Sequence, residues 1–179
     1  MPLYNTPSGP LKFPDAKSLY PSSPRVPLGQ AIAIGLSAGI LGALVMTGTN
    51  KLEQLLTSRP SSYVPGRTMA THLGLSSFYA KHPDILNHLH HFGMGMLGGV
   101  VRAGMSYVGV IGPVASFLHL GVRVAMDQFV EMTAGTSDWP WTWPINEQVI
   151  DLGHKGVYAL VVGYLCDRLV RGVDWFNWD

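Results

Sequence analysis

The amino-acid sequence predicts an all-α, polytopic integral membrane protein: a four-helix bundle preceded by a disordered, proline-rich tail. Three observations predict this class. Charged residues make up only 13% of the 179 residues, about half the share found in a typical soluble domain. The mean hydropathy is positive, at +0.20. An uncharged run long enough to cross a bilayer also lies near the start of the chain.

Residues 1–27 are expected to form the disordered tail. Seven of the 13 prolines lie in this stretch, among serine, asparagine, glycine and isolated charges. Because each proline fixes φ and lacks a backbone N–H, the composition predicts neither a helix nor a central strand here. Residues 28–175 are expected to form the transmembrane domain.

The first transmembrane helix is expected over residues 28–50. No residue between Arg25 and Lys51 is charged, and these 25 residues would span about 37 Å as a helix. The hydrocarbon core of a bilayer is about 30 Å thick. Gly35 and Gly39 lie four residues apart, a spacing that lets a second helix approach closely. A buried helix of a soluble bundle is the alternative interpretation of this run.

Three further helices are expected over residues 91–112, 113–135 and 146–170. Gly112 and Pro113 predict a tight reversal between antiparallel helices, because proline is well tolerated in the first helical turn. A short interfacial helix is expected within residues 68–80. The loop before the last helix carries Trp139, Trp141 and Trp143, and clustered tryptophans are typical of a membrane interface.

An even number of spans places both ends of the chain on the same side of the membrane. Basic residues flanking the outer ends number five, against four in the first loop. The positive-inside rule favours cytoplasmic ends by that margin of one. The five are Lys12, Lys17, Arg25, Arg168 and Arg171, and the four are Lys51, Arg59, Arg67 and Lys81.

Polar residues recur at helical spacing inside these apolar segments. On the third helix they follow every fourth position, so they share one broad face: His119, Arg123, Asp127 and Glu131. The other helices carry shorter stripes: His91 and Arg102 on the second, Asp151, His154 and Tyr158 on the fourth, and Glu53 after the first. Ionisable groups in hydrocarbon usually face a bundle interior or a water-filled cavity. We therefore expect polar groups inside and apolar faces outside.

These stripes supply candidate site residues for acid–base chemistry. Catalytic acid and base roles are assigned to Asp127, Glu131, Asp151 and His154. Substrate-binding roles are assigned to Arg123, His119, Arg102, His91, Glu53 and Tyr158. Burial and a nearby arginine act in opposite directions on a carboxyl group's affinity for a proton, so neighbouring carboxyls can divide into one acid and one base. Ion pairing that only holds the helices in register is the competing interpretation.

We predict no metal and no cofactor. The pairs His88/His91 and Asp151/His154 have a ligand spacing, but metal sites in helix bundles repeat a Glu-x-x-His motif, and this chain does not. His90 is expected to point away from His91. Cys166 is the sole cysteine and lies deep in an apolar helix, and the glycines near residue 95 follow no strand, so a thiol nucleophile and a dinucleotide loop are not expected.

The expected partners are the lipid bilayer, a lipophilic small molecule and a second copy of the chain. The second copy would pack through Gly35/Gly39 and Gly95/Gly99. The net charge of +1 offers no electrostatic basis for nucleic-acid binding. The leading function is a polar intramembrane chamber that handles a lipophilic small molecule or protons. The alternatives are a membrane-embedded acid–base enzyme, a cyclase or isomerase of a biosynthetic pathway, and a structural or assembly subunit.

The last third of the chain resembles a known family. Pro144, Glu147, Asp151 and Gly153-His154, followed by an apolar run that closes on Arg168 and Arg171, look like the C-terminal helix of the YagU-type inner-membrane proteins. The segments Lys51–Gln54 and Arg59–Pro65, and more loosely the helix with His119, are also similar to related membrane proteins. The resemblance implies a small four-helix membrane protein and no particular reaction.

Overall fold

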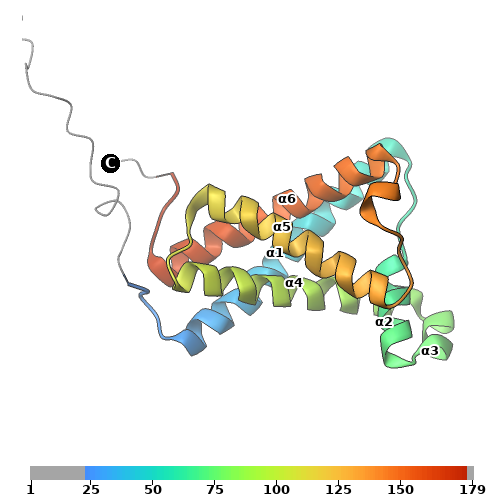
Figure 1. Ribbon diagram of the computed structural model, residues 1–179, viewed down its shortest axis with the longest axis horizontal. Helices are drawn as coiled ribbons and strands as arrows, with labels where there is room; N and C mark the ends of the chain where they lie inside the picture. The colour runs from blue at the N-terminus through green and yellow to red at the C-terminus, as the bar shows by residue number, and fades with distance from the viewer. Residues whose placement is uncertain (1–22, 177–179) are drawn as a thin grey trace, which may run out of the picture.

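The computed structural model describes residues 23–176, and no strand occurs in that range. Four long helices lie side by side (Figure 1): α1 (Leu28–Thr57), α4 (Pro83–Tyr107), α5 (Gly112–Thr133) and α6 (Ile145–Cys166). The shorter elements are α2 (Val64–Leu73), α3 (Ser76–Lys81), the single turn η1 (Pro140–Thr142) and the π-helical turn η2 (Asp167–Arg171). The all-α prediction is confirmed. Residues 1–22 of the predicted tail lie outside the described residues.

The helix limits differ from the expected ones for local reasons. α1 continues to Thr57 rather than residue 50, because residues 51–57 are mostly good helix formers without proline or glycine, and it ends at Ser58 with φ of 58°. α4 begins at Pro83 rather than residue 91, with its proline in the first turn, where it is tolerated, and ends at Tyr107. Gly74, with φ of 66°, ends α2, so two short helices replace the one expected over 68–80.

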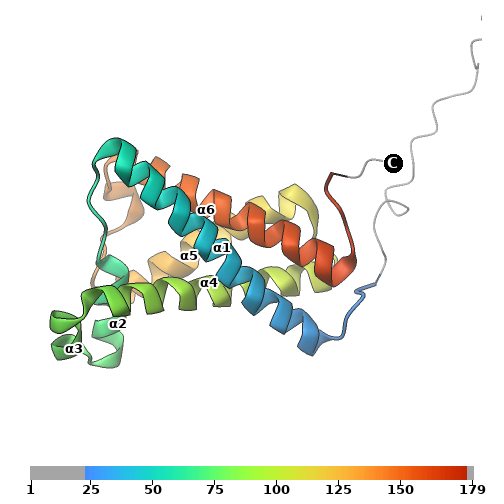
Figure 2. The ribbon, with the colours of Figure 1, turned by 180° about the vertical axis from the view of Figure 1, so that it is seen from behind.

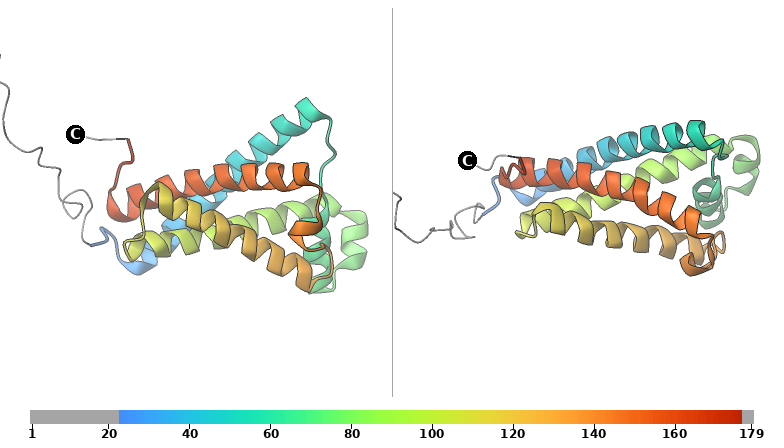
Figure 3. Two further views of the ribbon diagram at one scale, coloured as in Figure 1. Left: turned by 45° about the horizontal axis from the view of Figure 1, so that its top comes forward. Right: turned by 90° about the horizontal axis from the view of Figure 1, so that it is seen from above.

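The long helices alternate in direction, and their connections gather at two ends of the molecule (Figure 3). We name the end formed by residues 58–82 and 134–144 the open end, and that formed by residues 23–27, 108–111 and 167–176 the closed end. At the closed end the Arg25 amide donates a hydrogen bond to the Val170 carbonyl, at 2.7 Å. An even number of alternating helices places both ends of the described chain at the same end of the bundle, and this hydrogen bond joins them there.

α1 packs closely on α4 through glycine. Gly35 and Gly39 of α1 face Gly99 and Gly95 of α4, and a Cβ added to Gly35 would lie 2.7 Å from the Gly99 carbonyl oxygen. Figure 2 shows α1 crossing in front of α4 and α6. The expected close approach of another helix is thus provided by the same chain. Each glycine face is covered by the other, and these are the faces expected to meet a second copy.

The interior is unusually polar and the exterior unusually apolar. The largest fully buried side chains are Arg102, Arg123 and Tyr158. Large apolar side chains stand on the outer faces, including Phe117 at 73% exposure and Leu44 at 51%. The expected distribution, with polar groups inward, is therefore present. Within residues 23–176 two segments, α1 and Ile145–Arg171, are long and apolar enough to cross a membrane, a test that core helices of soluble proteins also pass.

Candidate binding cavity

A cavity of about 500 Å³ lies at the open end, between the ends of the four long helices. Its lining is dominated by groups that bind or release protons or carry charge: Lys51, Arg59, Asp84, His88, His90, His91, Arg123, Asp127, Glu131, Glu147, Asp151, His154 and Lys155. Six of the ten predicted site residues are among them: His91, Arg123, Asp127, Glu131, Asp151 and His154. The sequence stripes therefore converge on one place.

The floor of the cavity is an ionic chain that joins α5 to α6. On α5, Arg123 pairs with Asp127 one turn later. From α6, Lys155 Nζ lies 3.3 Å from Asp127 Oδ2 and 2.7 Å from Asp151 Oδ2. The four-residue spacing within each helix places these groups on one face. The charges of the two cations and the two carboxylates cancel, so this ionic chain is neutral as a whole although it borders the cavity.

Glu131 lies one turn beyond Asp127 and also lines the cavity. In residues 23–176 no cation lies within ion-pair distance of its carboxyl group, whereas Asp127 contacts two. The two neighbouring carboxyls of α5 therefore have different electrostatic environments. Such a difference is the physical requirement for one group to hold a proton while the other remains ionised.

Four histidines reach the cavity, three from α4 and one from α6. His91 Nε2 lies 3.0 Å from Thr47 Oγ1, and His154 Nδ1 lies 3.1 Å from Thr49 Oγ1. Both imidazoles are thus held by hydroxyls of α1. His90 also lines the cavity. The cavity is wide enough to be reached from adjacent positions of α4, which differ by about 100° around the helix.

The rim is tied together by residues of the first connector. Arg59 pairs with Glu53 of α1 at 2.8 Å and with Glu147 of α6 at 3.6 Å, and its hydrogen bond to Glu53 raises the pKa of the guanidinium. Tyr63 donates to Asp84 Oδ1 at 2.9 Å. This hydrogen bond raises the pKa of the Tyr63 phenol, which keeps its proton as a donor. Glu53 is thus a rim residue rather than part of the lining.

Two predicted site residues lie below the floor. Tyr158 is fully buried and donates to the Gly95 carbonyl at 2.6 Å, with the Arg123 guanidinium 5.4 Å from its ring centre. His119 is also fully buried, with Nε2 2.9 Å from the Gly98 carbonyl oxygen. Neither lines the cavity. Tyr158 packs against Arg123, and the two residues hold α5 and α6 against the glycine-rich face of α4.

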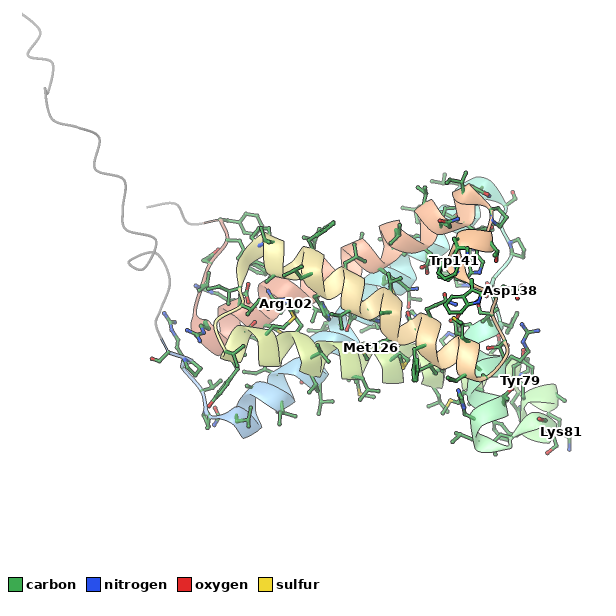
Figure 4. The ribbon with its side chains drawn as sticks, viewed as in Figure 1. Tyr79, Lys81, Arg102, Met126, Asp138 and Trp141 are labelled. Carbon is green, nitrogen blue, oxygen red and sulfur yellow. The ribbon has the colours of Figure 1, made fainter. Side chains whose placement is uncertain are left out.

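Arg102 lies at the closed end, far from the cavity (Figure 4). Its guanidinium pairs with Asp167 at 2.8 Å, and both side chains have 0% exposure. Asp167 also accepts hydrogen bonds from Ser106 at 2.6 Å, the Gly112 amide at 2.7 Å and the Trp175 indole at 3.0 Å. The sequence predicted a substrate-binding role for Arg102, but this residue does not line the cavity. Asp167 balances Arg102, so Arg102 does not contribute to the cavity.

Sequence reasoning missed the rim and floor residues Arg59, Tyr63 and Lys155. Lys155 follows Asp151 by four residues, a spacing that signals an ion pair on a helix. Arg59 has no such helical spacing to a partner, because it lies in a connector rich in proline and serine rather than on a helix. Within residues 23–176 no group of three or more histidine, cysteine or acidic side chains has a metal-binding arrangement. The pairs His88/His91 and Asp151/His154 do not converge with a third ligand there.

No protein-family model, curated protein or solved structure matches this chain. The resemblance to YagU-type proteins therefore stays a prediction from the sequence.

Proposed function

We propose that this chain is a small integral membrane protein in which all four long helices cross the bilayer. The spanning parts are the apolar lengths of α1, α4, α5 and α6, and the open end faces one aqueous side. The apolar outer faces support this arrangement, because they would bury their side chains in lipid rather than expose them to water. The stacked rings of Trp139 and Trp141, with centres 4.5 Å apart at the open end, suit the interface.

Thiol labelling tests the number of spans. Cys166 is buried, so a Cys166→Ala background can carry one new cysteine at Ser61, at the open end, or at Val110, between α4 and α5. Sealed vesicles of known orientation are treated with a membrane-impermeant maleimide. Four spans predict that Ser61→Cys and Val110→Cys react from opposite sides. If only α1 and α6 cross, both positions react from the same side, and the four-span proposal is wrong. The side that Ser61→Cys occupies also tests the predicted cytoplasmic location of the chain ends.

We further propose that the cavity handles a lipophilic small molecule, with protons exchanged at its carboxyl and imidazole groups. The main support for this proposal is that five carboxylates and four histidines from separate elements line one cavity of about 500 Å³. Groups of these types in a membrane bundle usually mark a functional interior. Among the described residues of the closed end, Arg102 and Asp167 have no exposed side-chain surface, which favours a chamber entered from the open end over a conduit.

Mass spectrometry of solvent extracts tests the chamber. Protein purified in mild detergent is extracted, and the released small molecules are compared between the wild type, Glu131→Gln and Asp138→Asn. Asp138 is exposed and does not line the cavity, so it is the matched acid-to-amide control. We expect a molecule retained by the wild type and the control but lost from Glu131→Gln. If all three extracts are alike, the cavity does not hold such a molecule, and a structural or assembly role gains support.

An acid–base enzyme is the second candidate, and the contrast between Asp127 and Glu131 favours it. One carboxyl is ion-paired with two cations and the other with none, which supplies an ionised group beside one that can carry a proton. An isomerase or cyclase that moves protons at carbon would incorporate deuterium from D₂O into a lipophilic substrate. Incubation of a host lipid extract with the protein in D₂O should show this exchange, and Glu131→Gln should abolish it.

A further inference from the structure

A second, apolar groove, shallow and open to the outside, lies on one face of α4. It has a volume of about 390 Å³ and is lined by Asp84, Ile85, His88, Leu89 and Phe92. Asp84 and His88 also line the polar cavity. The two surfaces therefore adjoin at Asp84 and His88, which brings both within reach of a single elongated molecule.

The apolar part of this groove is a regular helical stripe. Ile85, Leu89 and Phe92 lie at positions i, i+4 and i+7 of α4, which share one face of a helix. Ile85 is 48% and Leu89 54% exposed. From Ile85 to Phe92 the stripe extends about 10 Å along the helix axis. This surface suits one apolar chain that lies along α4.

The unbalanced charge of the cavity lining is negative. Five carboxylates face four basic side chains, and three of those four, Arg59, Arg123 and Lys155, are already ion-paired. Among the described residues Asp84 and Glu131 have no ion pair. Lys51, the fourth basic residue, is exposed at the rim and donates to Gln54 and Ser61. A cationic head group would therefore be attracted to the cavity.

The floor of the cavity also contains a buried donor. Arg123 is 2% exposed and lines the cavity, and its Nε has no hydrogen-bond acceptor among the described residues. A buried donor without an acceptor is costly. An oxygen on the head group of a bound molecule would supply that acceptor.

We propose that the cavity binds a single-chain lipid whose head group carries a protonated amine and a neighbouring hydroxyl oxygen. The head occupies the polar cavity, and the chain lies in the groove formed by Ile85, Leu89 and Phe92. This assignment rests on the proposed function of the cavity and specifies its ligand class. The molecule enters at the junction formed by Asp84 and His88, whether it comes from the bilayer or from a soluble carrier.

Photo-crosslinking tests the ligand class. The probe is 2-amino-1-dodecanol with a diazirine in its chain, added to the full chain in phosphatidylcholine nanodiscs, and the control probe is dodecanoic acid with the same diazirine. We expect the amine probe to label residues 85–92 and the acid probe to label them about tenfold less. Equal labelling by the two probes would overturn the amine assignment.

Two tryptophan variants locate the chain. Leu89 and Leu97 lie on α4 with 54% and 55% exposure, but only Leu89 lines the groove. Leu89→Trp should reduce amine-probe labelling about tenfold, Leu97→Trp should not, and Glu131→Gln should reduce it through the head group. Circular dichroism and gel filtration confirm that each variant is folded. If Leu89→Trp labels like Leu97→Trp, the groove does not hold the chain.

The two proposals fail separately. If the solvent extracts show a molecule lost from Glu131→Gln while the amine probe does not label α4, the cavity has its proposed function but the ligand class is wrong. If the wild type retains no molecule and neither probe labels residues 85–92, both are wrong. Reduced crosslinking in Leu89→Trp and Glu131→Gln, with Leu97→Trp unchanged, supports both.

Discussion

Both ends of this bundle contain a buried arginine paired with an aspartate, and their surroundings differ. At the closed end Arg102 and Asp167 have 0% exposed side chains, and Asp167 receives hydrogen bonds from a serine, a backbone amide and an indole. At the open end Arg123 and Asp127 join a longer chain through Lys155 to Asp151, whose side chain is 32% exposed. One pair is enclosed by its partners, and the other borders a cavity.

The comparison shows that a buried ion pair does not by itself indicate a functional site. At the closed end the carboxylate of Asp167 is surrounded by donors, so the cluster has the geometry that such a pair needs in a low-dielectric interior. At the open end Glu131 has no cation within the described residues, four histidines lie nearby, and water can reach them. Access to water and a carboxyl group without a cationic partner in residues 23–176, that of Glu131, distinguish the cavity at the open end from the ionic cluster at the closed end.

The largest expected effect is at the closed end. Asp167→Asn keeps the shape of the side chain but leaves Arg102 without a counter-charge, so the free energy of unfolding should fall by about 3–5 kcal/mol. Asp127→Asn, the matched change at the open end, should cost clearly less, because Asp151 still faces Lys155 and water can reach the site. Unfolding in denaturing detergent, followed by circular dichroism, measures both. Equal losses would remove the distinction between the two ends.

The next effect concerns the contact between α1 and α4. Gly99→Ala places a methyl group against backbone atoms of Gly35 and Gly39, and overpacking of this kind costs about 1–3 kcal/mol. Gly104 lies on the same helix with nothing within 4 Å of an added Cβ. Gly104→Ala should therefore be neutral or stabilising by up to about 1 kcal/mol. The same unfolding measurement applies, and equal behaviour of the two variants would contradict the close packing.

A smaller effect is expected for Glu131→Gln. Because no cation within the described residues is paired with this carboxyl, its loss should change the free energy of unfolding by less than about 1 kcal/mol. Loss of the retained molecule should nevertheless be complete. Thermal unfolding of the detergent-purified variant from acidic to alkaline pH provides the check. A large drop in melting temperature would mean that Glu131 holds the helices together.

Chemical modification of histidines distinguishes those that line the cavity from His119, which lies below its floor, and needs no mutation. His88 is exposed and His91 half-buried, whereas His119 has 0% exposure. Diethyl pyrocarbonate should therefore modify His88 first, His91 more slowly and His119 only after unfolding. Peptide mass spectrometry gives the order. Rapid modification of His119 in the folded protein would show that water reaches below the floor.

Helical spacing made part of this structure predictable. The four-residue repeat of His119, Arg123, Asp127 and Glu131 fixes a shared face whatever the neighbours are, so an inward polar stripe on α5 followed from the sequence. Gly35 and Gly39 likewise indicated a close helix contact. The partner, Gly95 and Gly99 in the same chain, needed the tertiary arrangement, since glycine spacing specifies a surface and not what covers it.

The partner of Arg102 was not predictable in the same way. Asp167 follows an apolar segment and precedes Arg168, a position in the sequence that is typical of a residue at the membrane interface. In the structure it begins the π-helical turn Asp167–Arg171 and lies fully buried against α4. A π-turn carries an extra residue and rotates the side chains that follow relative to an α-helix, so regular spacing cannot place them. The connector residue Arg59 was missed because its two partners lie on helices that meet only after folding.

The pairing of Arg102 with Asp167 also imposes an order on biosynthesis. The two residues are 65 positions apart, so at about 5–20 residues per second a ribosome needs about 3 to 13 s to make the second after the first. During that interval α4 can already dock on α1 through glycine, but its arginine lacks its counter-charge. Synthesis of Asp167 supplies the counter-charge of Arg102, so the ionic cluster of the closed end can form only after α6 has been made.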